Sequence, residues 1–257
     1  MHDPVERATS LIRNEFAEPL TLDDIANAAL MSRFHVSRIF HQVTGISPGR
    51  FLTAVRLNEA KRLLLTSTMS VADISCAVGY TSVGSFTTRF TDCVGVSPGK
   101  FRRLAELGVL GPIKPATARP ARSDGSLTGT VRLESGGTSG PIFMGIFDRP
   151  IPQGQPNACQ TVPAPGEWLL DPVPAGDWYV MAVTLDSTLP EWAEPGPSRR
   201  QMLLGASGPI HVRPTSLCDV ELTLRPPRPT DPPVLLALPS LLGTLRPDRE
   251  LGRSATS

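Results

Sequence analysis

Apolar side chains in the first hundred residues recur at the spacing of amphipathic helices. The pattern predicts a first helix near 4–17 and a second helix that begins after Thr21, which is a suitable N-cap. Ser32 can cap a third helix. The apolar residues of this third helix recur at i, i+3, i+4 and i+7 and predict a buried face: Val36, Ile39, Phe40 and Val43. The second and third helices together predict a helix-turn-helix.

The stretch GISPGRF (45–51) ends that third helix and begins another. Gly45 can take the left-handed conformation that closes a helix, and Ser47 can cap the next helix with Pro48 in its first position. The new helix carries an apolar stripe at Phe51, Val55, Leu57, Ala60, Leu63 and Leu64. Over about eighteen residues, at about 1.5 Å per residue, it spans roughly 27 Å.

The same pattern then occurs a second time. The stretch GVSPGKF at 95–101 copies the first one, and aligning the copies places Phe90 on Phe40 and Gly95 on Gly45. The sequence therefore predicts two helix-turn-helix units joined by the long helix. Adjacent major grooves on one face of DNA are about 34 Å apart, so two such units can reach successive turns of a duplex. Paired helices also occur in bundles and solenoids that bind nothing, and that alternative stays open.

The composition of the chain changes near residue 105. Only 4 of the 27 prolines and 6 of the 22 glycines lie in residues 1–104. The later apolar runs are short, rich in β-branched and aromatic residues, and separated by proline and glycine turns. In DVELTL, for example, Val220, Leu222 and Leu224 share one face. These strands predict an antiparallel β-sandwich or a small barrel.

The expected fold class is therefore multidomain α and β. An all-α double helix-turn-helix domain is followed by an all-β, sandwich-like, antiparallel domain. The predicted boundaries are 1–106 for the helical domain, 107–125 for a linker, 126–238 for the β domain and 239–257 for a flexible tail.

Charge and cysteine content restrict the classes of partner and the cellular compartment that can be expected. The formal net charge is only +1, but residues 1–104 hold 12 lysines and arginines against 9 aspartates and glutamates, which weakly favours an anionic partner. No apolar run of about eighteen residues and no signal-peptide layout is present, so we expect a cytoplasmic protein without a membrane partner. The four cysteines form no CxxC pair and are expected to be free thiols.

Both Gly-x-Ser-Pro elements, the VGY turn at 78–80 and the apolar spacing occur together between residues 5 and 104. In this combination the chain resembles the AraC/XylS type of transcriptional regulator, over about two-fifths of its length. The resemblance implies sequence-specific binding to promoter DNA, with recognition helices at about 32–43 and 82–93 in successive major grooves. Such regulators commonly carry an effector-sensing or dimerising domain, usually ahead of the DNA-binding unit, which here is followed by the β domain.

The residues expected to read bases lie on the polar faces of the two recognition helices. The first helix presents Arg33, Phe34, Ser37 and Arg38. The second presents Ser82, Gly84, Ser85, Thr88 and Arg89, with Thr88 where many family members have arginine. Arginine binds guanine through two hydrogen bonds and Phe34 can meet a thymine methyl group, but phosphate contact by these arginines stays open.

The residues expected to hold DNA phosphates are His35, Arg50, Lys100, Arg102 and Arg103. The last four lie at or near predicted helix starts, where backbone N–H groups and cations can bind phosphate together. The alternative for each of the four is an ordinary solvated charge.

The second half contains no GxSxG, HExxH, P-loop or glycine-rich dinucleotide motif, so we expect no enzyme, no catalytic residue, no cofactor and no metal. Seven methionine and aromatic residues either line a pocket for a small-molecule effector or form the sandwich core: Phe143, Met144, Phe147, Trp168, Trp178, Tyr179 and Met181. A homodimer formed through this half is a further expectation. The alternative to a DNA-binding regulator is a protein-interaction or small-molecule-binding module in which the helix pairs only scaffold the β domain.

Overall fold

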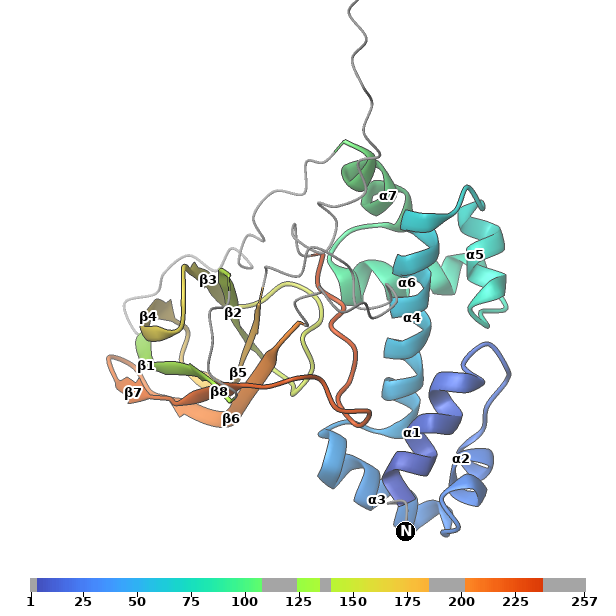
Figure 1. The fold of residues 1–257 in the computed structure, drawn as a ribbon, viewed down its shortest axis with the longest axis horizontal. Coiled ribbons are helices and arrows are strands. Elements are labelled where there is room, and N and C mark those ends of the chain that lie inside the picture. The colour runs from blue at the N-terminus through green and yellow to red at the C-terminus, as the bar shows by residue number, and fades with distance from the viewer. Residues whose placement is uncertain (1–3, 108–123, 135–139, 185–201, 238–257) are drawn as a thin grey trace, which may run out of the picture.

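The computed structural model describes residues 4–107, 124–134, 140–184 and 202–237, and Figure 1 shows their arrangement. Residues 4–107, the helical half, contain α1 (Pro4–Asn14), α2 (Leu22–Ala28), α3 (Arg33–Thr44), α4 (Pro48–Thr66), α5 (Val71–Ala77), α6 (Val83–Val94) and α7 (Pro98–Glu106). The predicted double helix-turn-helix is confirmed, although the first helix ends earlier than expected.

The predicted N-caps are present. The Thr21 hydroxyl accepts a hydrogen bond from the backbone N–H of Asp24, and the Asp24 carboxylate accepts one from the Thr21 N–H at 2.8 Å. The Thr21 hydroxyl also donates to the Asp24 carboxylate at 2.6 Å, and this bond, followed by the one from the Thr21 N–H, holds the pKa of the exposed Asp24 carboxyl below its ordinary value. The Ser32 hydroxyl accepts from the His35 N–H at 3.3 Å. Local side-chain chemistry therefore sets where α2 and α3 begin.

Two equivalent glycines end α3 and α6. Gly45 has φ of 75° and Gly95 has φ of 91°, the left-handed conformation that closes a helix and favours glycine. After the first of them, Ser47 takes the N-cap position of α4 and Pro48 the first helical position, as predicted, although the Ser47 side chain makes no capping hydrogen bond.

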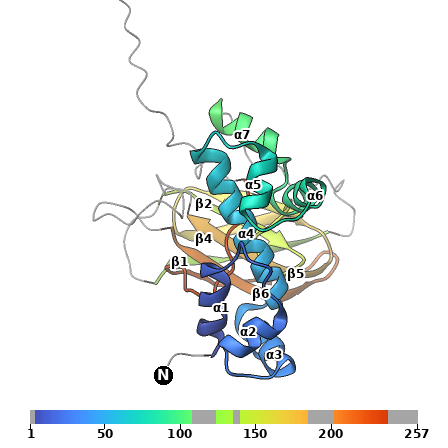
Figure 2. The same cartoon turned by 90° about the vertical axis from the view of Figure 1, so that its right-hand side faces the viewer.

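Matching aromatic pairs form the core of each unit. The rings of Phe40 and Phe51 meet edge to face at 5.4 Å in the first unit, and those of Phe90 and Phe101 meet in the same way at 5.7 Å in the second. Figure 2 shows α4 running between the two units. The expectation that Val43 is buried is wrong: its side chain is 49% exposed, because the last turn of α3 extends past this core.

The second half is a sandwich of two sheets. Its strands are β1 (Gly125–Leu133), β2 (Ile142–Phe147), β3 (Ala158–Val162), β4 (Gly166–Val173), β5 (Gly176–Thr184), β6 (Leu204–Val212), β7 (Leu217–Asp219) and β8 (Leu222–Leu224). In the described residues one sheet pairs β1 with β4, β7 and β8, and the other has the order β3-β2-β5-β6. The antiparallel expectation fails only at β1, which is parallel to β7 and β8. The predicted shared face of Val220, Leu222 and Leu224 is buried.

Strand β2, with the sequence IFMGIF, is buried along its whole length. Ile142, Met144 and Ile146 point into the core between the two sheets. Phe143 and Phe147 belong instead to the apolar cluster of the helical half. Since side chains alternate along a strand, one face of this sheet is covered by the other sheet and the opposite face by the helical half. The two halves therefore share a continuous apolar contact.

After β8 the chain leaves the sandwich and runs beside α4 (Figure 1). We call residues 226–237 the strap. Its residues Val234, Leu235 and Leu236 are buried in the apolar cluster of the helical half. On α4, the side chain of Lys61 is only 2% exposed, and its Nζ donates to the carbonyl oxygens of Val234 at 3.0 Å and Leu236 at 3.1 Å. The strap thus supplies hydrogen-bond acceptors to a buried ammonium group.

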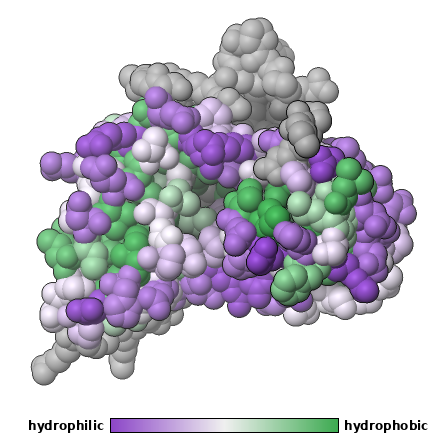
Figure 3. Space-filling view, turned by 90° about the horizontal axis from the view of Figure 1, so that it is seen from below, coloured by the Kyte–Doolittle hydropathy of each residue, from purple (hydrophilic) through white to green (hydrophobic). Residues whose placement is uncertain are grey.

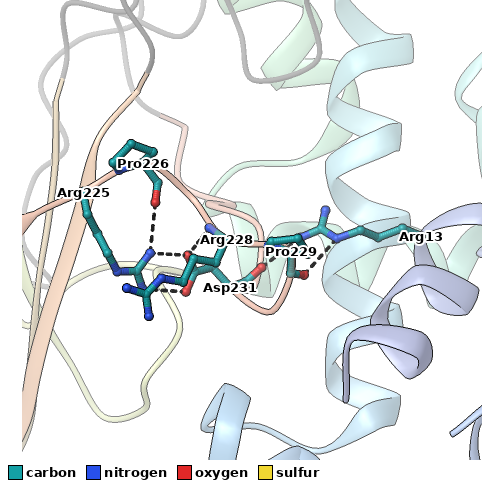
Figure 4. A network of polar contacts seen from close by, with 6 residues as sticks. All are labelled: Arg13, Arg225, Pro226, Arg228, Pro229 and Asp231. Atoms are coloured by element: carbon teal, nitrogen blue, oxygen red, sulfur yellow. Dashed lines mark hydrogen bonds and ion pairs between the residues drawn. The ribbon is translucent and has the colours of Figure 1, made fainter. Parts of the chain in front are cut away.

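A second polar network fixes the turn at the start of the strap (Figure 4). Arg13 of α1 donates to the carbonyl oxygens of Pro229 at 3.2 Å and Asp231 at 2.9 Å. The Asp231 carboxylate accepts two hydrogen bonds from Arg225, at 2.7 and 2.9 Å, and one from the Arg228 N–H at 2.6 Å. Burial raises the pKa of Asp231, but these hydrogen bonds outweigh it, so the pKa lies below its ordinary value.

The predicted domain boundaries stay predictions. Most of the expected linker, 108–123, and the expected tail, 239–257, lie outside the described residues. The strap falls within the predicted β domain in sequence but packs on the helices in space.

Candidate nucleic-acid interface

The base-reading residues predicted on α3 lie at its start. Arg33, Phe34 and Arg38 are exposed and Ser37 is half-buried. The Phe34 ring is 79% exposed, which leaves it available to a thymine methyl group. Arg33 Nε lies 3.0 Å from the Asp23 carboxylate, but both side chains are mostly exposed. Such a surface ion pair is weak and can give way to a stronger anionic partner.

The corresponding face of α6 offers fewer long side chains. Ser82 is the N-cap: its hydroxyl accepts from the Ser85 N–H at 3.1 Å and donates to the Ser85 hydroxyl at 2.9 Å. Gly84, Thr88 and Arg89 are exposed. Two of the five predicted residues are therefore hydrogen-bonded to each other, and Arg89 is the long cationic side chain of this face.

The twelve lysines and arginines of residues 1–104 fall into two equal groups. In the first group the charged ends bind backbone carbonyl oxygens or, for Arg62, the carboxylate of Glu59: Arg7, Arg13, Arg56, Lys61, Arg62 and Arg102. The second group is exposed: Arg33, Arg38, Arg50, Arg89, Lys100 and Arg103. Within the described residues, Arg33 is the only member of this second group with an ion pair. All six were predicted DNA contacts.

Arg102 departs from its predicted role. Its Nε donates to the Leu64 carbonyl at 3.1 Å and its Nη2 to the Met69 carbonyl at 2.7 Å. These bonds satisfy carbonyl oxygens at and after the C-terminal end of α4, where a cation is favourable. The guanidinium is therefore occupied inside the protein, so the predicted phosphate contact does not fit this side chain. Its neighbour Arg103 is exposed.

The two Gly-x-Ser-Pro elements place cations at helix starts. Arg50 lies in the first turn of α4 and Lys100 in the first turn of α7, and both are exposed. Gly49 and Gly99 precede them, and a Cβ placed on either glycine would meet no atom within 4 Å. Each first turn therefore carries an exposed cation, and a helix start with a cation beside it is an arrangement that can bind a phosphate. His35, the remaining predicted phosphate contact, is exposed on α3.

A family model described as a helix-turn-helix domain matches residues 25–104, which include α3, the connecting helix α4 and α6. Residues 25–104 are an AraC-type helix-turn-helix domain.

Known proteins resemble the chain over this AraC-type domain. An uncharacterized HTH-type transcriptional regulator of Haemophilus influenzae is 43% identical over 86 residues, which are 34% of this chain and 29% of that protein. The bifunctional transcriptional activator/DNA repair enzyme AdaA of Bacillus subtilis is 30% identical over 103 residues, 40% of this chain and 49% of that protein. The chain thus spans less than half the length of either curated relative.

Among solved structures, a transcriptional regulator of Chromobacterium violaceum, described as AraC-type DNA-binding domain-containing, is 31% identical. The match covers 39% of this chain and 90% of that one, with a TM-score of 0.38.

The sheet half touches the far ends of both recognition helices of the AraC-type domain. A Cβ placed on Gly45 would lie 2.7 Å from Pro150 Cγ, so the end of α3 packs directly on the loop between β2 and β3. In the same loop, the Gly154 N–H donates to the Cys93 carbonyl in the last turn of α6 at 2.5 Å. Burial raises the pKa of the Cys93 thiol. Sequence reasoning missed this loop because neither helix pattern nor motif marks it.

A cavity of about 400 Å³ lies where the last turn of α3 faces the sheet half. Figure 3, seen from below, shows hydrophobic areas on both halves of the molecule. Of the seven methionine and aromatic residues considered from the sequence, four line this cavity: Phe143, Phe147, Tyr179 and Met181. Met144 and Trp168 are in the sandwich core, and Trp178 packs against it. The set is therefore divided between the lining of this cavity and the sandwich core.

The described residues contain neither a cluster of metal-ligand side chains nor a helix suited to a membrane. In that part of the chain, no group of three or more histidine, cysteine, aspartate or glutamate side chains is placed to hold a metal ion. No described helix has the length and hydrophobicity needed to cross a membrane.

Proposed function

We propose that this protein is a sequence-specific DNA-binding transcription regulator that places α3 and α6 in successive major grooves. The division of the basic residues carries the proposal: the six exposed cations of the AraC-type domain lie on α3, on α6, in the first turn of α4 and in the first and last turns of α7. Lysines and arginines that served only solubility would be spread over the whole surface. Their concentration on these four segments is instead what binding to DNA phosphates requires. Helix α4, with 19 residues and a length of about 28 Å, holds the two units apart by nearly one turn of DNA.

In this proposal α3 supplies most of the base reading. Arg33 and Arg38 bind guanine edges, Phe34 packs on a thymine methyl group and Ser37 offers a hydroxyl. The face of α6, with Ser82, Gly84, Ser85, Thr88 and Arg89, contributes less discrimination because Arg89 is its single long polar side chain. His35, Arg50, Lys100 and Arg103 hold phosphates. Arg102 is left out because its guanidinium donates to the carbonyl oxygens of Leu64 and Met69.

The test is selection of bound sites from random DNA by the full-length protein at moderate salt. We expect an enriched two-part motif whose halves are about one helical turn apart, with sharper base preference in the half read by α3. Binding should weaken with salt, and the slope of log K against log salt should be no steeper than about −5 if the six exposed cations of the AraC-type domain make the phosphate contacts. Recovery of random sequence would overturn the proposal.

The roles of the second half belong to the same proposal. We infer a regulator without catalytic activity that acts in the cytoplasm, with the sheet half sensing a small-molecule effector or forming a homodimer. The regulator names of most relatives favour this, although AdaA is also named as a DNA repair enzyme. A protein-interaction module with the helices as scaffold is the alternative, and it predicts no selected motif in the experiment above. The full chain is needed in that experiment because the strap completes the helical core.

A further inference from the structure

The cavity between the two halves has the size and lining of a small-molecule site. Its volume of about 400 Å³ falls within the range of about 300–1,000 Å³ that ligand pockets occupy. Strands β2 and β5 contribute Phe143, Phe147, Tyr179 and Met181, and β6 contributes Ala206 at the edge of the same space. Phe143 and Phe147 are almost fully buried, so this wall is held rigid by packing on its other sides.

The opposite wall is the last turn of α3. Val43, which is 49% exposed, and His41 face the cavity from this turn. Val43 is half exposed because it lies beyond the end of the helical core. The sheet half lies on the other side of the cavity from it. A molecule in the cavity would therefore touch a recognition helix on one side and the sheet on the other.

The charged groups around the cavity restrict what it can hold. Arg225 and Asp231 lie on its wall, but they form a two-bond ion pair with each other, so neither offers an unpaired charge. The other polar groups include the imidazole of His41, the hydroxyl of Tyr179 and the amide of Gln42. Burying an unpaired charge in such surroundings is costly, whereas apolar surface is favoured.

We propose that this cavity binds a small, uncharged, mainly apolar molecule with a ring system, in contact with both the last turn of α3 and the sheet half. Aromatic and methionine side chains supply the contact area, and the few polar groups orient a single hydrogen-bonding substituent. The inference gives a location and a chemical class to the effector in the proposed function, and any consequence for DNA binding rests on that function.

The test uses two fluorescent probes on the full-length protein without DNA. N-phenylnaphthylamine is neutral and emits more strongly in apolar surroundings, and anilinonaphthalenesulfonate carries the same rings with an added sulfonate. We expect saturable binding of the neutral probe at one site per chain, and binding of the sulfonate at least about tenfold weaker, because its charge must be desolvated.

Two variants fill the cavity from opposite walls. Ala206→Trp adds a large side chain from β6, and Val43→Trp adds one from α3; both positions are exposed enough to leave the core intact. Each substitution should lower the affinity for the neutral probe by about tenfold or more. Leu169→Trp is the matched control, since Leu169 is 57% exposed on β4 of the other sheet and does not line the cavity. It should bind the probe as the unaltered protein does.

Three results would overturn the inference: no saturable binding of the neutral probe, equal affinity for the sulfonate, or unchanged affinity in both filled variants. Urea unfolding of each variant checks that it is folded. If one variant does not fold, the other still measures the effect of filling the cavity. Because no DNA is present, failure of DNA binding and failure of probe binding are separate outcomes.

Discussion

Pro150 of the sheet half packs against Gly45, the glycine that closes the first recognition helix. A Cβ at Gly45 would come within 2.7 Å of Pro150 Cγ and 3.0 Å of its Cβ, and Gly45 has φ of 75°. Gly45→Ala should therefore lower the free energy of unfolding for two separate reasons. The left-handed backbone costs about 1–2 kcal/mol for alanine, and the contact with Pro150 adds to it. Urea unfolding measures the sum.

Gly95→Ala is the matched control for that substitution. Gly95 ends α6 in the same left-handed conformation, with φ of 91°, but the nearest atom to an added Cβ is Gln155 Cγ at an ordinary 3.9 Å. This variant should lose only the backbone part, about 1–2 kcal/mol. Equal losses for the two variants would mean that the Pro150 contact contributes nothing.

Arg38→Ala tests base reading by α3. The side chain is exposed and has no intramolecular hydrogen bond among the described residues, so its loss should leave the fold unchanged. If Arg38 binds a guanine edge, affinity for the selected site falls by about 1–3 kcal/mol and discrimination relaxes at one base position. Titration against a panel of single-base variants measures this. A uniform loss across the panel would assign Arg38 to a phosphate instead.

Arg102 and Arg103 are adjacent in sequence, but we expect Arg103 to bind DNA and Arg102 to stabilise the fold. Arg103→Ala should weaken DNA binding on all sequences and reduce the salt slope by about one, with no change in stability. Arg102→Ala should instead reduce stability by about 1–3 kcal/mol, because the Leu64 and Met69 carbonyls lose their donor. Salt-dependent binding and urea unfolding of both variants separate the roles, and the reverse pattern would exchange them.

Asp231→Asn tests the strap. The variant should lose about 2 kcal/mol of stability at neutral pH, since a charge-assisted hydrogen-bond network with Arg225 and Arg228 is broken. The pKa of Asp231 lies below its ordinary value of 3.8, so this stabilisation is complete well above that pH and disappears as pH falls through the lower, folded value.

Unfolding measured across pH should therefore show the variant and the unaltered protein converging in acid. Asp219→Asn, at an exposed position of β7, is the control and should follow the unaltered protein at every pH. A difference between Asp231→Asn and the unaltered protein that stays constant into strong acid would exclude the carboxylate as its source.

Sequence reasoning succeeded where the determining interactions are local. The caps at Thr21 and Ser32 bond to groups three residues away, and the glycines that end α3 and α6 act within one turn. The exposure of Arg33, Arg38 and Arg89 was also predicted, because the polar face of a helix follows directly from its apolar periodicity.

Prediction failed where the partner is distant in the chain. Arg102 was assigned to phosphate because it lies near a predicted helix start. Its acceptors lie 38 and 33 residues before it, on segments whose meeting no local pattern reveals. Lys61 binds carbonyl oxygens 173 and 175 residues away, and the cavity is bounded by segments from both halves. The parallel pairing of β1 with β7 and β8 is likewise a long-range relationship that alternation within a strand cannot specify.

The loop between β2 and β3 reaches the ends of both recognition helices, with Pro150 at one and Gly154 at the other. The loop therefore bridges the ends of α3 and α6, in addition to the connection that α4 makes between the two units. Insertion or deletion of a residue there should change the preferred separation of the two operator half-sites. If the protein binds DNA as proposed, a change in the length of this loop would alter the choice of promoter while every side chain proposed to read bases stays the same.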